Sequence, residues 1–279
     1  MLIRLLAVSV AAALCMTGCA SRPPGSSSLK SAFVAPGKPQ PHLDADDPVV
    51  MEPAAWGRLP RPGGLAGRTL TVSSLHDLKL RDKEVVLTFD DGPVPGKTER
   101  ILATLNQYGV KATFLMVGQM AETYPAIARK VVASGQTIGS HTYRHRDLQN
   151  LAFDAAMTEI MRGEKAVEKA TAVDAAFFRF PYLADTRRLR TALDARGVIV
   201  TDVDVDSKDY FKSTPAAVVN RTMTALRKRG HGIILMHDIH KRTGNMLPTL
   251  LDELKAGGYK VVTLRHKRTR MPMLMASAE

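Results

Sequence analysis

Two adjacent carboxylates, Asp90 and Asp91, follow the apolar, β-branched run 85–89 and come directly before a Gly-Pro pair. Successive side chains of an extended strand point to opposite sides, so these two carboxylates are expected to do different work. One would bind a metal ion while its neighbour accepts a proton. In isolation the pair is more typical of a solvated Asp-Gly turn, so its chemistry depends on partners elsewhere in the chain.

Two histidines, His141 and His145, offer such partners. They are four residues apart, a spacing that puts both side chains on one face of a helical turn. With Asp91 they would form a set of two histidines and one carboxylate that leaves metal positions open for water and substrate. The zinc-protease motif shares this spacing but needs a glutamate where Thr142 stands. Non-haem iron oxygenases use the same ligand set, so the ligands alone leave the reaction undecided.

Three further segments place polar residues after apolar runs. Arg179 could hold a carboxylate ionised or make a structural salt bridge, and His237 is a candidate for acid–base work. The segment 202–210 is rich in aspartate, but serines occupy the positions where a calcium loop starting at Asp202 needs glycine and glutamate. The segment 92–98 imitates a phosphate loop, but its spacing and its prolines exclude that function.

The elements that must position these residues alternate along the chain. Strands are predicted over 85–89, 112–117, 177–180, 198–201, 232–236 and 260–264, and helices over 97–108, 124–134, 153–170, 186–196, 215–229 and 245–256. Most of the helical segments end at a glycine, a usual stop signal. Alternation with nearly continuous apolar strands predicts a parallel α/β sheet, with a barrel favoured over an open sheet. The candidate residues would then gather at the strand carboxyl ends.

Composition limits the class of protein. The chain has 279 residues, is 45% hydrophobic and 24% charged, and carries a formal net charge of +12. Such a basic balance favours either anionic partners or a solvated basic surface. No zinc-finger, zipper or aromatic single-strand motif occurs, so nucleic acid is not an expected partner. The basic cluster at 265–270 is interpreted as part of a tail.

The N-terminus is typical of an exported protein. The run 5–16 is too short to span a bilayer core of about 30 Å and predicts a signal peptide over 1–18. Segment 16–19 (Met-Thr-Gly-Cys) resembles the lipobox of bacterial lipoproteins, with Cys19 as the lipidated residue; ordinary secretion without lipid is the alternative. Cleavage before Cys19 removes Cys15, so the mature domain would have no disulfide and no cysteine ligand. Any metal must then be held by histidine and carboxylate.

Four regions are therefore predicted. A signal peptide over 1–18 precedes a flexible tether rich in Pro, Gly and Ser over 19–64. A catalytic domain over 65–268 and a C-terminal tail over 269–279 follow. The long tether suits an anchored domain that must reach its target.

Five short motifs occur in order: 88–93 (TFDDGP), 141–145 (HTYRH), 179–182 (RFPY), 206–210 (DSKDY) and 235–237 (LMH). Together they resemble the polysaccharide deacetylase family, also called carbohydrate esterase family four, over about residues 83–264. The resemblance implies a distorted (β/α) barrel, usually with seven strands. It also implies an enzyme that removes acetyl groups from sugars, most often from N-acetylglucosamine.

The resemblance assigns catalytic roles to residues of this chain. Asp90 would be the base that activates water, and Arg179 would orient it. His237 would protonate the leaving amine, and Asp209 would orient His237. The divalent metal, in this family usually zinc, would be held by Asp91, His141 and His145.

The resemblance also assigns a substrate-binding set. The backbone N–H of Tyr182 would stabilise the oxyanion, a contribution of roughly 3–4 kcal/mol, and Leu235 would line the acetate pocket. Pro181 and Tyr210 complete the set. The fourth motif usually ends in Trp, so Tyr210 changes the groove wall and with it the choice of substrate. No role follows for Asp202, Asp204, Asp206 or His240.

The sequence thus predicts a monomeric, lipid-anchored enzyme of the cell envelope, facing the periplasm or the outside. It would remove N-acetyl groups from an acetylated polysaccharide such as peptidoglycan or a chitin-like glycan. An O-acetyl esterase on the same fold is the nearest alternative. A non-catalytic glycan-binding lipoprotein is the alternative from another class.

Overall fold

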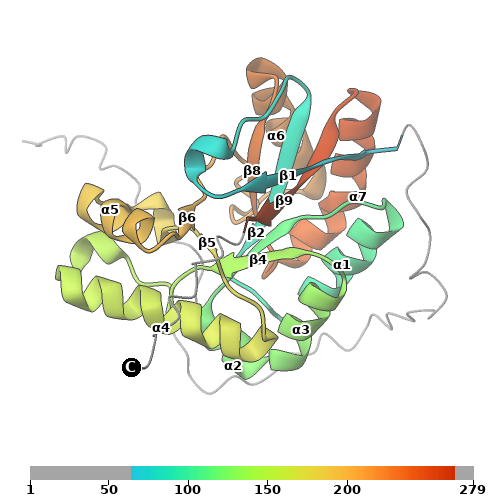
Figure 1. Ribbon diagram of the computed structural model, residues 1–279. Coiled ribbons are helices and arrows are strands. Elements are labelled where there is room, and N and C mark those ends of the chain that lie inside the picture. The colour runs from blue at the N-terminus through green and yellow to red at the C-terminus, as the bar shows by residue number, and fades with distance from the viewer. Residues whose placement is uncertain (1–63, 268–279) are drawn as a thin grey trace, which may run out of the picture. The chain divides into compact units, whose positions relative to one another are not determined.

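All the strands run parallel, as the alternating sequence pattern predicts. A computed structural model describes residues 64–267, which form one sheet of nine strands (Figure 1). The strands are β1 (Ala66–Val72), β2 (Glu84–Asp90), β3 (Thr113–Met116), β4 (Thr137–Ser140), β5 (Phe177–Phe178), β6 (Ile199–Val200), β7 (Val205–Asp206), β8 (Gly232–His237) and β9 (Lys260–His266). Every strand pair is parallel, so all the strand carboxyl ends point the same way.

Seven strands follow one path, β6-β5-β4-β3-β2-β8-β7, in which β2 lies between β3 and β8. β9 pairs only with the first two residues of β2, and β1 adds to the outside of β9. Within residues 64–267 no ladder joins β6 to β7, which are the two ends of the path. This seven-stranded, incompletely closed arrangement confirms the predicted distorted α/β barrel.

The helices form a row of neighbours outside the strands, in the order α6, α7, α1, α3, α4 and α5 (Figure 1). Because each parallel crossover needs a connection that packs on the sheet, helices accumulate there. The helices are α1 (Lys97–Gln107), α2 (Gly118–Thr123), α3 (Pro125–Ala133), α4 (Phe153–Thr171), α5 (Arg187–Ala195), α6 (Pro215–Arg229) and α7 (Lys241–Ala256). Short 3₁₀ turns lie at η2 (Leu75–Asp77), η3 (Leu148–Asn150) and η4 (Pro181–Leu183).

The period of two along β2 separates its two faces. Leu87 and Phe89 pack outward in the cluster shared with the helices, whereas Val86 packs in a second cluster with residues of β5, β8 and β9. Alternation places Thr88 and Asp90 on the same side as Val86. The apolar inner layer therefore continues into a polar layer at the carboxyl end of the strand.

Most predicted elements are present, with differences at their ends. α1 begins at Lys97 as predicted, but α7 begins at Lys241, four residues before the predicted start. Strands β1, β4 and β7 and helix α2 were not predicted, because segments of two to seven residues carry little periodic signal. Among residues 64–267, none of the helices is long and apolar enough to cross a membrane. The predicted signal peptide, Cys19 and nearly all of the tether lie outside the described residues.

Candidate active site

The carboxyl ends of five strands supply the predicted site residues. β2 ends at Asp90 and β8 ends at His237, and these two residues are register partners in adjacent strands. The loops that follow β2, β4, β5 and β7 carry the others. All seven side chains are buried: Asp90, Asp91, His141, His145, Arg179, Asp209 and His237. The structure therefore gathers the predicted residues at one end of the sheet.

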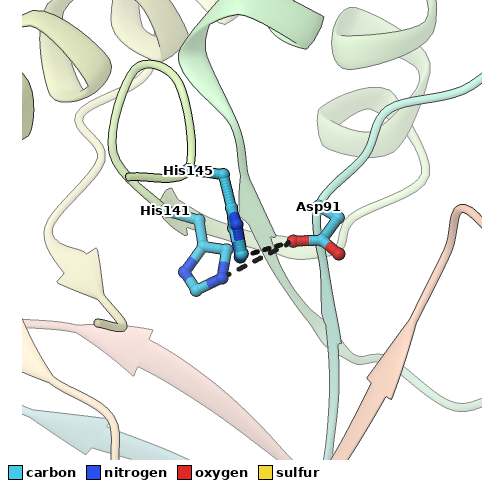
Figure 2. A group of neighbouring side chains, drawn as sticks. All are labelled: Asp91, His141 and His145. Atoms are coloured by element: carbon cyan, nitrogen blue, oxygen red, sulfur yellow. Dashed lines mark ion pairs between the residues drawn. The ribbon is translucent and has the colours of Figure 1, made fainter. Parts of the chain in front are cut away.

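Asp91, His141 and His145 form a compact cluster (Figure 2). Nε2 of His145 lies 3.3 Å, and Nε2 of His141 lies 3.6 Å, from the same carboxylate oxygen, Asp91 Oδ1. One ligand atom from each residue lies within 4.8 Å of the other two. Two imidazole nitrogens and a carboxylate oxygen are a donor set suited to zinc and related divalent cations. This cluster fits a divalent metal ion.

The tautomer of His141 supports the same conclusion. Its Nδ1 lies 2.8 Å from the backbone carbonyl oxygen of Arg179, so Nδ1 carries the proton and donates it. Burial, followed by the neighbouring His145, lowers the pKa of His141 to about 3, and burial also lowers the pKa of His145. The Nε2 lone pair of His141 thus faces the carboxylate of Asp91. Two such electron-rich atoms repel one another unless a cation lies between them.

The two histidines do not lie on a helical turn, so that prediction is wrong. Residues 141–147 form a loop in which Thr142 (φ 67°) and His145 (φ 54°) adopt left-handed backbone conformations. The hydroxyl of Thr142 accepts the backbone N–H of His145 at 2.9 Å. Gly163 of α4 packs against this loop so closely that a Cβ there would lie 2.3 Å from the carbonyl carbon of Thr142. Packing against a helix brings the two rings together.

The two aspartates also differ from expectation, since they do not point to opposite sides. The strand ends at Asp90, and Asp91 takes a left-handed conformation with φ 80°. As a result Nε2 of His141 lies 3.8 Å from Asp90 Oδ2 and 3.6 Å from Asp91 Oδ1. Both carboxylates face the same ring, because the chain turns sharply between them.

Asp90 is held by Arg179, which is 1% exposed. Nη1 of Arg179 donates to Asp90 Oδ1 and to the hydroxyl of Thr88, both at 2.8 Å, and Nε donates to the carbonyl oxygen of Thr201 at 3.1 Å. Burial raises the pKa of Asp90, whereas the charges of Arg179 and His237 oppose that rise, and the result is about 6. Asp90 is therefore a carboxylate that can take and release a proton near neutral pH.

His237 is paired with Asp209 through two hydrogen bonds. Its Nδ1 lies 2.7 Å from Asp209 Oδ1, and its backbone N–H donates to Asp209 Oδ2 at 2.8 Å. Burial by itself lowers the pKa of His237, but the carboxylate of Asp209 outweighs it, with help from Asp91 and Asp90, and raises the pKa to about 10. His237 is therefore a protonated imidazole able to donate a proton from Nε2.

The other aspartates of segment 202–210 have no hydrogen bond to His237. The family resemblance assigned Asp209 as the partner of this histidine and gave no role to Asp202, Asp204 or Asp206. The three remaining side chains bond elsewhere: Asp202 to Arg190 at 2.5 Å, Asp204 to the backbone N–H of Ile233 at 2.9 Å, and Asp206 to the hydroxyl of Tyr210 at 2.9 Å.

Two of the predicted substrate-binding residues lie beside His145 and His237. The half-exposed Tyr182 has φ 59°, and its ring lies 4.7 Å from that of His145. On the other side, the ring of Tyr210 lies 5.4 Å from that of His237, edge on. Pro181 and Leu235 are buried, and Leu235 is the register partner of Thr88. An extended chain lying across the site would meet an aromatic ring on each side.

Sequence reasoning missed several polar residues beside the site. Thr88 lies two residues before Asp90, and the period of a strand could have placed it on the same face. Asp238 is buried and accepts the hydroxyl of Thr98 at 2.6 Å; its position next to His237 was the only signal. Thr243 donates to Asp209, and no sequence pattern indicated it, because α7 was expected to begin later.

Comparison with known proteins gives consistent matches. A family model described as polysaccharide deacetylase matches residues 77–200. A chitin deacetylase of Colletotrichum lindemuthianum is 32% identical over 192 residues, which cover 64% of this chain and 77% of that protein. The peptidoglycan-N-acetylglucosamine deacetylase PgdA of Listeria monocytogenes is 33% identical over 183 residues, which cover 66% of this chain and 38% of that protein. A solved peptidoglycan deacetylase of Bdellovibrio bacteriovorus superposes with a TM-score of 0.64 at 30% identity, covering 75% of this chain and 58% of that one.

Fold and site together define a parallel α/β protein with a buried Asp-His-His cluster that fits a divalent metal. The chain belongs to the polysaccharide deacetylase family, because it covers 77% of a chitin deacetylase at 32% identity. The family predicted from the five motifs is thereby confirmed. The chain spans 38% of the length of the Listeria relative, so the two proteins correspond over one part of that longer chain.

Proposed function

We propose that this protein is a metal-dependent hydrolase that removes N-acetyl groups from N-acetylglucosamine residues of a cell-envelope or exported polysaccharide. One observation carries the proposal: beside a metal-binding cluster lie a carboxylate whose pKa is about 6 and an imidazole whose pKa is about 10. Amide hydrolysis needs a base and an acid whose pKa values are separated in this way. The relatives, which are described as peptidoglycan and chitin deacetylases, act on such amides.

Asp91, His141 and His145 would hold the metal, and zinc suits their donor set best. When bound there, a divalent cation supplies a Lewis acid that polarises the acetyl carbonyl and lowers the pKa of water toward about 7.

Asp90 would accept the proton of the attacking water, while Arg179 holds its carboxylate through Nη1, which donates both to Asp90 Oδ1 and to the hydroxyl of Thr88. His237 would give its Nε2 proton to the leaving amine, with Asp209 holding Nδ1. The backbone N–H of Tyr182 would stabilise the developing oxyanion. Leu235 and Pro181 would line the acetyl group, and Tyr210 would form part of the groove wall.

The protein would work at the cell envelope as a monomer. Segment 16–19 supports lipidation at Cys19 after removal of the signal peptide, and residues 19–64 would serve as a tether between the membrane anchor and the catalytic domain over 65–268. Such a tether would let the domain reach peptidoglycan or an exported glycan. Deacetylation exposes an amine and so makes the polymer more positively charged.

The test is acetate release from peptidoglycan, N-acetylglucosamine oligomers and O-acetylated xylan, with and without a chelator. We expect release from the N-acetylated substrates, its loss after chelation and its recovery on adding zinc. Asp90→Asn should retain the metal yet lose nearly all turnover. Release from acetylated xylan alone would identify an O-acetyl esterase instead. Binding without any release would identify a glycan-binding protein.

A further inference from the structure

The carboxylate of Asp209 has a second side-chain partner beyond His237. Asp209 and Thr243 are both 0% exposed, and the hydroxyl of Thr243 donates to Asp209 Oδ2 at 2.5 Å. The same oxygen accepts the backbone N–H of His237, while Oδ1 faces the ring nitrogen. Among residues 64–267, Thr243 is the one side chain other than His237 that bonds to this carboxylate.

Thr243 approaches Asp209 from a rigid element. It lies in the first turn of α7, where its backbone N–H donates to the carbonyl oxygen of His240 at 3.0 Å. Its neighbour Arg242 donates from Nη1 to the backbone carbonyl oxygen of Asp209. The start of α7 thus holds Asp209 by both its main chain and its side chain. The loop that carries Asp209 is fastened to a sixteen-residue helix.

The orientation of the Asp209 carboxylate depends on its hydrogen bond from Thr243. Both bonds from His237 come from one residue, so they allow the carboxylate and the ring to move together. The hydroxyl of Thr243 ties Oδ2 to a different element and removes that freedom. Because Asp209 is fully buried, water cannot take the place of a lost donor. The orientation of the imidazole therefore depends on a residue that does not touch it.

We propose that Thr243 is a positioning residue for His237: its hydroxyl holds the carboxylate of Asp209 and so directs the imidazole toward the leaving group. The sequence spacing is His237-x5-Thr243. The proposal rests on the function proposed above, in which His237 is the acid. Thr243 would thus join His237 and Asp209 as a third residue, and it lies on α7, a helix that carries no other residue assigned to the reaction.

The experiment compares Thr243→Val with Thr243→Ser. Valine preserves the shape of threonine but removes the donor, so kcat for acetate release should fall about tenfold, the size expected for losing one hydrogen bond to a charged group. KM and metal content should stay at the wild-type values. Serine restores the donor and should bring kcat back to within about twofold. Thr243→Ala covers the case in which the valine variant does not fold, and it should show the same loss.

Thr222→Val is the matched control. Thr222 is also 0% exposed and lies in a helix, but its hydroxyl donates to the carbonyl oxygen of Val218 within α6, at 2.8 Å. This variant should lose stability without losing kcat. A Thr243→Val enzyme with wild-type kcat would overturn the proposal. So would a serine variant as impaired as the valine variant, because packing and not the hydroxyl would then be responsible.

A second measurement separates this proposal from the proposed function. The Nδ1–H proton of His237, bonded to a buried carboxylate, should give a downfield proton resonance that Asp209→Asn abolishes. Thr243→Val should broaden or shift that resonance, and Thr222→Val should leave it unchanged. If the wild-type protein releases no acetate from any glycan, the proposed function fails. The resonance still decides whether Thr243 positions His237, and an unchanged resonance in Thr243→Val rejects it.

Discussion

Two buried histidines at the same end of the sheet reach opposite protonation states. His141 and His237 each use Nδ1 to contact an oxygen, at 2.8 Å and 2.7 Å. For His141 that oxygen is the backbone carbonyl of Arg179, and for His237 it is the carboxylate of Asp209. The pKa of His141 is lowered to about 3 by burial and by His145, whereas the pKa of His237 rises to about 10 because the carboxylate outweighs burial.

The difference bears on the two proposed roles, His141 as a metal ligand and His237 as a proton donor. Both rings are buried, so burial alone would make both neutral. A neutral carbonyl fixes the tautomer and leaves an Nε2 lone pair for a metal, whereas a carboxylate keeps the second proton on the ring. The partner of Nδ1, supplied by a distant part of the chain, therefore divides the site into a metal half and an acid half.

Removing a ring from the metal half should have the largest effect. His141→Ala takes away one of three ligands, so bound metal should fall to background and kcat/KM should drop on the order of a thousandfold or more. Metal analysis of the purified protein and acetate release provide the measurements. His76→Ala, at an exposed position in η2, is the control and should match the wild type. Retention of metal by His141→Ala would remove this residue from the metal half.

The second largest loss of activity is expected from neutralising the carboxylate of Asp209 in the acid half. Asp209→Asn removes the charge that keeps His237 protonated, so kcat should fall on the order of a hundredfold, as for a lost general acid. Metal content should not change, since Asp209 belongs to the other half. Single-turnover acetate release and metal analysis on the same preparation test both statements. Loss of metal in this variant would mean that the two halves are not separable.

The pH dependence of kcat/KM should report the ionisation of two groups, Asp90 and His237. Asp90 works as a base only when ionised, so activity should fall as pH drops through about 6, the value to which burial raises its pKa against the opposing charge of Arg179. A bound cation favours the ionised form of Asp90, so the acid limb of the pH profile should have its midpoint at or below pH 6. His237 must be protonated, so activity should fall as pH rises through about 10. In Asp209→Asn the alkaline limb should move to lower pH while the acid limb stays; a fixed alkaline limb would contradict this assignment.

The smallest effect is expected from the packing that supports the metal half. Alanine in place of a mid-helix glycine normally stabilises by about 0.5–1 kcal/mol. At Gly163, however, a Cβ would lie 2.3 Å from the backbone carbonyl carbon of Thr142, and such overpacking costs roughly 1–3 kcal/mol. Gly163→Ala should therefore lower the melting temperature and weaken metal binding. Gly244→Ala, whose Cβ would meet only the flexible Arg100 side chain at 3.1 Å, should not; equal losses in both variants would point to a general helix effect.

Much of this arrangement could be predicted from local order. Five motifs identified the family, and apolar runs ending in polar residues placed Asp90, Arg179 and His237 at strand ends, because strand periodicity is written in neighbouring residues. The geometry within the motifs could not be predicted from neighbouring residues. His141 and His145 were expected on a helical turn, yet a loop with two left-handed residues joins them. That loop depends on contact with Gly163 in α4, which local spacing does not reveal.

The sequence by itself determined the inventory: which side chains could act as ligands, base and acid, and in which order they occur along the chain. Only the tertiary structure decided the contacts through which these groups pair, whereas the pairs Asp90–Arg179 and His237–Asp209 were implied by the family resemblance. The tertiary structure brings Asp209 to hydrogen-bond the ring of His237, and it joins Arg179 to Asp90 across 89 positions of the chain. The physical reason is that a pKa and an orientation depend on burial and on the nearest charge, and folding supplies both from remote segments.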